Sequence, residues 1–218
     1  MPRKKVSPSK QSTFELSSSF HSINFKQREF NFTVKQQKLL ESILHENTKI
    51  IFVAGPAGSS KTYMSVYGCL QLMAKDFQKD LLYIRSIAES ADKGLGSLPG
   101  DTAYMKQIGR ISAVPINFLR GANWNNRLIV ADEAQNFTFK ELTTLITRVG
   151  ENTKLIICGD FMQSDINGRS GFREMFDLFN CEESQEHGIT SFKFTNRDIV
   201  RSKILKYIVS KIENHKSV

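Results

Sequence analysis

The stretch FVAGPAGSSKTYM, residues Phe52 to Met64, decides the fold of this chain. Within it, Gly55 to Thr62 follow the phosphate-binding pattern G-x-x-x-x-G-K-[ST], except that Ser60 stands where the pattern has its second glycine. An apolar run that leads into this pattern predicts a buried strand, a loop of backbone N–H groups and the start of a helix. Such a loop binds the phosphates of a nucleotide.

The serine at position 60 is the one departure from this pattern. A positive φ there would cost serine about 1 kcal/mol, so we expect Ser60 to adopt the right-handed helical backbone just before Lys61. Gly58 remains to supply an unusual backbone conformation. We therefore expect a loop that still binds nucleotide.

The rest of the chain repeats the order of strand and helix. The predicted strands are 49–55, 81–85, 114–119, 127–132, 154–160 and 191–194, and the predicted helices are 33–46, 61–75, 139–149, 171–179 and 196–212. Thr33 is the expected cap of the first helix. Strands that are apolar throughout and alternate with helices predict an α/β fold with an open, mostly parallel sheet flanked by helices. We expect a flexible basic leader over 1–31 and a single domain over 32–218.

Composition limits the class of protein. The chain has 218 residues, is 40% hydrophobic and has a net charge of +8, and it has no apolar run that could act as a signal sequence or cross a membrane. We expect a cytoplasmic protein without a membrane partner, in the host cytoplasm if a phage encodes it. Its three cysteines lack C-x-x-C spacing, which favours buried thiols over disulfides or zinc ligands. The positive charge favours a polyanionic partner.

The phosphate loop supplies the first group of candidate site residues. Its members are Gly55, Pro56, Ala57, Gly58, Ser59, Ser60, Lys61 and Thr62. The Lys61 ammonium is expected to reach the β- and γ-phosphates, and the Thr62 hydroxyl to bind Mg²⁺.

Two further strand ends carry polar groups, and ligands of open α/β sheets bind at the carboxyl ends of strands. The run LIVADEAQ places Asp132 at the tip of a strand, where it is expected to hold Mg²⁺, and Glu133 beyond it, where a carboxylate can orient or deprotonate the attacking water. The run IICGDFMQ places Gln163 where an amide can sense the γ-phosphate or that water. Together the three strand ends predict a site for ATP and Mg²⁺.

Several further pieces join these motifs: LGSLPGD (95–101), RGANWNN (120–126), TRVG (147–150) and FTNRDIVR (194–201). With GPAGSSKT, ADEAQN and CGDFMQSD, they make the chain resemble the PhoH family in its short, phage-type form. The resemblance implies a RecA-like P-loop ATPase similar to the motor domain of superfamily 1 helicases. It also implies coupling to single-stranded DNA or RNA, and assembly into oligomeric rings.

The same resemblance implies roles for three more residues. Gln36 matches a glutamine that hydrogen-bonds adenine and so favours ATP, although Gln37 is an alternative. Arg148 and Arg201 match arginines placed to face a γ-phosphate, and an arginine from a neighbouring subunit could raise the rate roughly 10³-fold or more. Because the predicted domain leaves half of the nucleotide uncovered, we expect a homo-oligomer, a ring in which one of these arginines acts on the adjacent subunit.

Nucleic-acid contact is expected from the loop over 86–106. It is rich in glycine and has Arg85, Lys93 and Lys106 near Tyr104, which suit phosphates and one stacked base. The alternative is a surface turn with two leucines packed into the core.

Two other functions remain open. A nucleotide-switched binding module would hydrolyse little, although Glu133 argues against it. A P-loop phosphotransferase would need an acceptor site with a mobile lid, and no segment resembles one.

Overall fold

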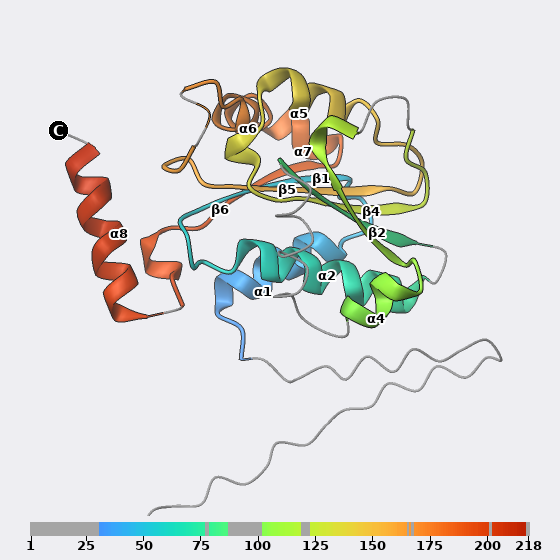
Figure 1. Cartoon of the computed structure of the whole chain (residues 1–218), viewed down its shortest axis with the longest axis horizontal. Coiled ribbons are helices and arrows are strands. Elements are labelled where there is room, and N and C mark those ends of the chain that lie inside the picture. The colour runs from blue at the N-terminus through green and yellow to red at the C-terminus, as the bar shows by residue number, and fades with distance from the viewer. Residues whose placement is uncertain are drawn as a thin grey trace, which may run out of the picture.

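The computed structural model describes residues 31–76, 79–86, 102–118, 123–164, 166, 168–200 and 202–216. The predicted leader falls almost wholly outside these ranges and stays a prediction. The described part forms one sheet between two layers of helices (Figure 1). Within it, no helix is both long and apolar enough to cross a bilayer.

The sheet has six strands in the order β3-β2-β4-β5-β1-β6, and every neighbouring pair runs parallel. The strands are β1 (Ile50–Ala54), β2 (Asp80–Arg85), β3 (Ile111–Pro115), β4 (Arg127–Ala131), β5 (Lys154–Gly159) and β6 (Ile189–Lys193). This confirms the predicted fold class: an α/β fold with a parallel sheet flanked by helices.

Helices cover both faces of the sheet (Figure 1). One face carries α1 (Val34–Leu44), α2 (Lys61–Lys75) and α4 (Thr102–Gln107), and the other carries α5 (Phe139–Ile146), α6 (Phe172–Leu178) and α7 (Glu182–Glu186). Short 3₁₀ turns are η1 (Ile116–Phe118), η2 (Ala134–Asn136) and η3 (Asn196–Asp198), and α8 (Lys203–Lys216) ends the described chain. In Figure 1, α8 stands beside the layered body rather than on the sheet.

Each strand divides its side chains between two cores. In β1, Ile51 and Val53 pack with α1 and α2, whereas Phe52 and Ala54 pack with α5 and α6. All five residues of β1 are buried, as expected for a central parallel strand covered on both faces. The hydrophobic run before the phosphate loop therefore fixes the loop to the middle of the sheet.

Most predicted elements form within a few residues of their expected bounds, and Thr33 caps α1 as expected. Some predictions need correction. The strand expected at 114–119 is β3, because Ile111 to Pro115 pair in register with Leu81 to Arg85 and the chain then turns into η1. Helices α4 and α7 were not expected. Cys69 and Cys158 are buried as predicted, but Cys181 is exposed.

The helix expected over 196–212 is interrupted. Residues Asn196–Asp198 form the short turn η3, Ile199 is extended at φ −69° and ψ 120°, and α8 begins only at Lys203. The Val200 N–H donates to the Gly58 carbonyl over 3.1 Å. The chain leaves helical geometry here because its backbone bonds to the phosphate loop.

Candidate active site

The phosphate loop joins the end of β1 to the first turn of α2, as predicted. Gly58 has φ +82°, a left-handed conformation that suits glycine. Gly55 has no room for a side chain, because a Cβ atom there would lie 2.6 Å from the Cβ of Phe194. The buried Ser59 hydroxyl donates to the Pro56 carbonyl over 2.8 Å and closes the turn. These contacts hold the loop in one shape.

The prediction for the Ser60 backbone is wrong. Ser60 is left-handed, with φ 66° and ψ 22°, and it is the N-cap of α2 without a side-chain capping bond. The loop must turn sharply to aim its N–H groups and those of α2 at one point, so the chain needs a positive φ immediately before Lys61. The phosphate-binding pattern has glycine at this position, and serine adopts the same left-handed conformation at a cost of about 1–2 kcal/mol.

The Lys61 side chain folds back over the loop. Its ammonium donates to the carbonyl oxygens of Gly55, at 2.6 Å, and Pro56, at 3.0 Å. The positive charge therefore lies at the phosphate loop, and Lys61 lines the same cavity as Ser60 and Thr62 at the start of α2. A helix N-terminus and an ammonium together favour an anion.

Asp132 is the central acceptor of the site. It is 5% exposed. Its Oδ1 accepts from the Thr62 hydroxyl and its Oδ2 from the Tyr83 hydroxyl, each over 2.6 Å. The Arg85 Nε lies 3.3 Å from the same Oδ2. A buried carboxylate needs such partners, because an unpaired one would be strongly destabilising.

Glu133 follows Asp132 in a left-handed conformation, with φ 54° and ψ 40°. Its side chain is 39% exposed and pairs with the Arg85 guanidinium. The turn thus directs two consecutive carboxylates to the same arginine. Arg85, which the sequence predicts to contact nucleic acid, lies in this carboxylate cluster, and that predicted role stays a prediction.

Burial and the charge of Asp132 raise the pKa of Tyr83 well above its usual range, so its hydroxyl stays a donor. Burial, and then the same carboxylate, raise the pKa of the Cys158 thiol to about 12. Cys158 is therefore a neutral thiol at physiological pH, in contact with the Ser65 hydroxyl at 3.2 Å.

The third strand end lies between the other two, since β5 is flanked by β1 and β4. The Asp160 N–H donates to Gln135 Oε1 over 3.0 Å, and Asp160 Oδ1 accepts from the Met162 N–H over 2.9 Å. The Gln163 N–H reaches the Asp160 carbonyl at 3.4 Å, and the exposed Gln163 lines the cavity shared by the three strand ends. Gln163 is thus near the loop and both carboxylates, as the sequence predicts.

A cavity of about 420 Å³ joins the three strand ends. Its lining includes Ala57, Gly58, Ser60, Lys61, Thr62, Tyr83, Arg85, Asp132, Glu133, Gln135, Asp160 and Gln163. No cluster of three or more His, Cys, Asp or Glu side chains with metal-binding geometry occurs among the described residues. The Thr62 hydroxyl and the Asp132 carboxylate form an oxygen pair, and Mg²⁺ bound with a nucleotide needs few protein oxygens beyond such a pair.

Two predicted site residues lie away from this cavity, and a third is not among the described residues. Gln36 is buried, and its Oε1 accepts from the Thr33 N–H in a capping box at the start of α1, outside the cavity lining. Arg148 follows α5, and its carbonyl accepts from the Trp124 N–H just before β4. It therefore lies toward the amino ends of the strands, opposite the phosphate loop. Arg201 lies outside the described residues, as does most of the loop predicted to bind nucleic acid.

Sequence reasoning missed the roles of Tyr83, Arg85 and Gln135. The signal was present in β2, where LLYIR places a tyrosine and an arginine in a strand that is otherwise apolar. Because Ile84 pairs with Ala131, Arg85 lies next to Asp132 across two neighbouring strands. That neighbourhood depends on the strand order, which one sequence does not reveal.

Comparison with known proteins gives a consistent picture. Protein PhoH of Escherichia coli (strain K12) is 31% identical over 186 residues, which cover 72% of this chain and 51% of that protein. The PhoH-like protein of Mycobacterium tuberculosis (strain ATCC 25618 / H37Rv) is 28% identical over 203 residues, which cover 81% and 56%. The chain spans about half the length of the curated relatives it matches.

Among solved structures, Pif1 from a Bacteroides species in complex with ADP-AlF4 is 17% identical with a TM-score of 0.43, covering 77% of this chain and 42% of that one. A structure of two coordinating Pif1 helicases at forked dsDNA is 15% identical with a TM-score of 0.46, covering 77% and 44%.

The sequence profile described as "PhoH-like protein" matches residues 31–108 and 102–213. This range includes the phosphate loop, both carboxylates after β4 and the strand end after β5. Since the match extends over most of the chain and over every part of the cavity described above, the chain belongs to the PhoH family.

Proposed function

We propose that the protein binds ATP with Mg²⁺ and hydrolyses it. The observation that supports this most directly is the contact between Thr62 and Asp132, with Lys61 and Glu133 on the same cavity. These are the residue types that hold a triphosphate, a magnesium ion and a water molecule in P-loop ATPases.

Each residue has a distinct part in the proposal. Lys61 and the N–H groups of the loop bind the phosphates, while Thr62 and Asp132 hold Mg²⁺, which neutralises charge on the phosphate oxygens. Glu133 orients and deprotonates the attacking water. To do this, the Glu133 carboxylate must release the Arg85 guanidinium and bind the water instead. Arg85 is therefore placed to keep the base inactive until ATP occupies the site.

We further propose that hydrolysis is coupled to single-stranded DNA or RNA. The net charge of +8 supports a polyanionic partner, because each phosphate neutralised by lysine or arginine releases counterions. Recognition of the adenine base by Gln36 or Gln37 rests only on the family resemblance. In the described structure, the capping role of Gln36 makes the exposed Gln37 an equal candidate.

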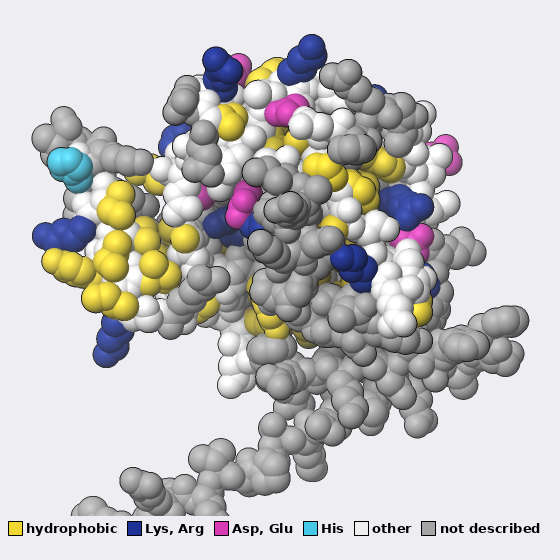
Figure 2. Space-filling view, viewed as in Figure 1, with side chains coloured by type: hydrophobic (Ala, Val, Ile, Leu, Met, Phe, Trp, Pro, Cys, Tyr) yellow, Lys and Arg dark blue, Asp and Glu magenta, His cyan; other side chains and the backbone are white. Residues whose placement is uncertain are grey.

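A homo-oligomer, with ring geometry, is the third part of the proposal. The helix α8 presents a row of apolar side chains to solvent, visible at its place in Figure 2: Ile204 is 66% exposed, Tyr207 61%, Ile208 45% and Ile212 50%. The spacing of these residues makes one helical face. A second copy of the chain would bury this face, and it could bring Arg148 or Arg201 to a neighbouring phosphate loop.

The alternative is a nucleotide-switched binding module with little turnover. The ion pair between Arg85 and Glu133 favours it, because a paired carboxylate is a poor base. Phosphate release from ATP, measured with and without single-stranded DNA or RNA, separates the two. We expect release that rises when nucleic acid is added. ATP binding without release under all conditions would support the module.

A further inference from the structure

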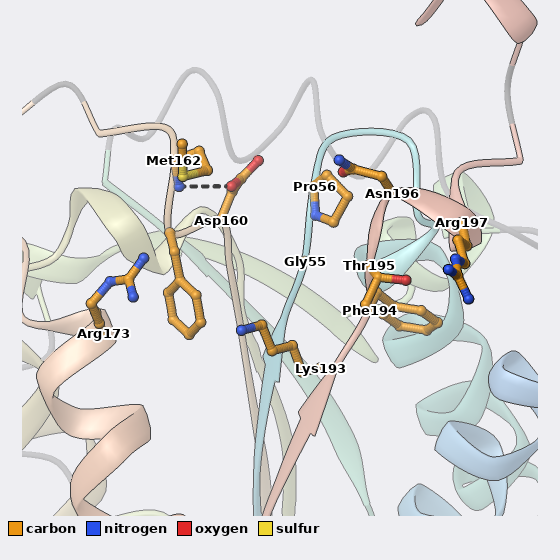
Figure 3. A pocket seen from close by; sticks show the side chains of 11 residues that line it. Gly55, Pro56, Asp160, Met162, Arg173, Lys193, Phe194, Thr195, Asn196 and Arg197 are labelled. Carbon is orange, nitrogen blue, oxygen red and sulfur yellow. Dashed lines mark hydrogen bonds between the residues drawn. The ribbon is translucent and has the colours of Figure 1, made fainter. Parts of the chain in front are cut away.

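A second cavity of about 470 Å³ adjoins the phosphate loop and has no part in the proposed chemistry (Figure 3). It lies over the carboxyl ends of β5, β1 and β6, and its lining includes Gly55 and Pro56 at the start of the loop. Asp160 lines both this cavity and the nucleotide cavity. A ligand here would therefore contact the same backbone that shapes the ATP site.

Three cations line this cavity and come from three different elements. Arg173 belongs to α6, Lys193 ends β6 and Arg197 lies in η3, and all three are exposed. Among the described residues, none of them pairs with a carboxylate. Within the described lining of the cavity, the acidic side chain is Asp160, which is 6% exposed and accepts from the Met162 N–H. The charge that faces a ligand is therefore positive.

An aromatic ring holds two of these cations in place. The Arg173 guanidinium carbon lies 4.5 Å from the centroid of the Phe161 ring, and the Lys193 ammonium lies 5.6 Å from it. Phe161 is itself fixed by ring contacts with Phe172 and Phe176, at centroid distances of 5.4 and 5.2 Å. Because the partner is a ring and not a carboxylate, the cations are oriented without being neutralised.

We propose that this cavity is a subsite for single-stranded nucleic acid, in which Arg173, Lys193 and Arg197 bind backbone phosphates and the Phe161–Arg173 pair offers a flat surface to a base. Proteins that bind single strands without sequence preference combine cations along the backbone with stacking surfaces in this way. Figure 3 shows the three cations spread across the strand ends, an arrangement that suits successive phosphates better than one free phosphate. The inference rests on the nucleic-acid coupling proposed above.

The position of the cavity also suggests how a bound nucleic-acid strand affects ATP hydrolysis. The Asp160 N–H donates to Gln135, a residue of η2 that follows Asp132 and Glu133 in the chain. The Phe194 N–H donates to the Ala54 carbonyl over 2.7 Å. A nucleic-acid strand in the cavity would contact the segments at Asp160 and at Phe194. It would thus contact both sides of the phosphate loop.

The test is fluorescence anisotropy of labelled oligo-dT and oligo-U with the full chain, in the absence of any nucleotide. Arg173→Ala with Lys193→Ala should weaken binding roughly tenfold or more. The slope of log K against log salt should fall by about 1.4, since each single-strand phosphate contact contributes about 0.7. Phe161→Leu keeps an apolar side chain against Phe172 but removes the ring, and it should weaken binding about fivefold.

The matched control is Lys38→Ala with Lys140→Ala, which removes the same charge from exposed positions on α1 and α5. Wild-type affinity and salt slope in the Arg173/Lys193 variant would overturn the subsite. So would an equal loss in the control, which would indicate only a general effect of charge. Displacement of the oligonucleotide by inorganic phosphate, but not by chloride at equal ionic strength, would show a free-phosphate site instead and also overturn it.

The assay contains no ATP, so its result is independent of hydrolysis. If the wild type binds oligonucleotide through these residues but releases no phosphate from ATP, the proposed ATPase fails and the subsite stands. If ATP is hydrolysed but the variants bind like wild type, the subsite fails and the ATPase stands.

Discussion

The Thr62 hydroxyl donates a hydrogen bond of 2.6 Å to Asp132 Oδ1, across 70 positions of the chain. Thr62 lies in the first turn of α2 and Asp132 directly after β4, and β5 and β1 place these two ends at one edge of the sheet. The contact joins the phosphate loop to the carboxylate pair and so defines the proposed site for Mg²⁺ and ATP.

Substitution of Lys61 should act on ATP binding. Lys61→Ala removes a cation from the loop, and a charge-assisted hydrogen bond of roughly 1.5–3 kcal/mol corresponds to a loss of affinity of roughly 10- to 150-fold. Binding of a fluorescent ATP analogue measures this. Lys75→Ala, at the exposed far end of the same helix, is the control and should bind like wild type. Unchanged affinity in Lys61→Ala would contradict the assigned contact.

Substitution of Glu133 should act on the chemical step. Glu133→Gln keeps the size of the side chain and loses the base, so ATP should still bind while turnover falls roughly 10²-fold or more. Phosphate release under single-turnover conditions measures the step directly. Glu151→Gln, an exposed change before β5, should leave the rate as it is. Equal turnover in wild type and Glu133→Gln would remove the role of Glu133 as base.

The left-handed backbone of Ser60 predicts a gain in stability from glycine. Relief of about 1–2 kcal/mol of strain is partly offset by the 0.5–1 kcal/mol of chain entropy that glycine loses on folding. Ser60→Gly should therefore raise the free energy of unfolding by about 1 kcal/mol or less, measured by urea denaturation. Its ATPase rate should change by less than about tenfold, or roughly 1.4 kcal/mol.

A second positive-φ residue offers the control for this change. Asn152 has φ 53° and lies in the turn before β5, away from the cavity. Asparagine tolerates this conformation better than serine, so Asn152→Gly should gain less stability. A rate increase far above tenfold in Ser60→Gly would mean that the natural loop is impaired.

Lys154 should make stability depend on pH. Burial lowers the pKa of its ammonium from 10.5 to about 8, although the ammonium donates to the carbonyls of Ile43 and His45. Between these two values the unfolded chain binds more protons than the folded one, so the free energy of unfolding should rise as pH rises from about 8. Below pH 8 both states are protonated and the effect of this residue is constant.

The comparison with Lys154→Met isolates this effect, because the substitution removes the titrating group and keeps an unbranched side chain. From pH 8 to pH 10, the unfolding free energy of wild type should rise relative to that of Lys154→Met. A difference that stays flat with pH would show that Lys154 keeps its ordinary pKa.

Assembly should restore activity to paired inactive subunits. A Lys61→Ala subunit lacks its own phosphate contact, and an Arg148→Ala subunit lacks the arginine offered to its neighbour, so a mixture should regain part of the ATPase rate. Arg201→Ala is tested in parallel. No recovery with either arginine variant would contradict an arginine supplied by a neighbour.

The apolar face of α8 gives this assembly an independent test. Ile204→Ser with Ile212→Ser should shift the protein toward monomer in light scattering, because both side chains are at least half exposed in the single chain. Lys203→Ser, at the start of the same helix, should leave the assembly unchanged.

The sequence alone determined the local parts of this protein. The run Ile50 to Ala54 is apolar throughout, and the glycines after it allow a tight loop, so strand, loop and helix could be read directly. The same local logic located Asp132 and Glu133 at the end of β4. Such features depend on residues that are neighbours in the chain, and a single sequence contains all of that information.

The tertiary structure alone decided which distant groups meet. The strand order puts β2 beside β4, and for that reason Arg85 pairs with Glu133. The hydrogen bond from the Val200 N–H to the Gly58 carbonyl interrupts a helix that the sequence predicts. The sharp turn of the phosphate loop requires a left-handed backbone at Ser60. In each case a contact across the fold outweighs local preference, because such preferences amount to about 1 kcal/mol per residue and the packed sheet leaves no other position for the chain.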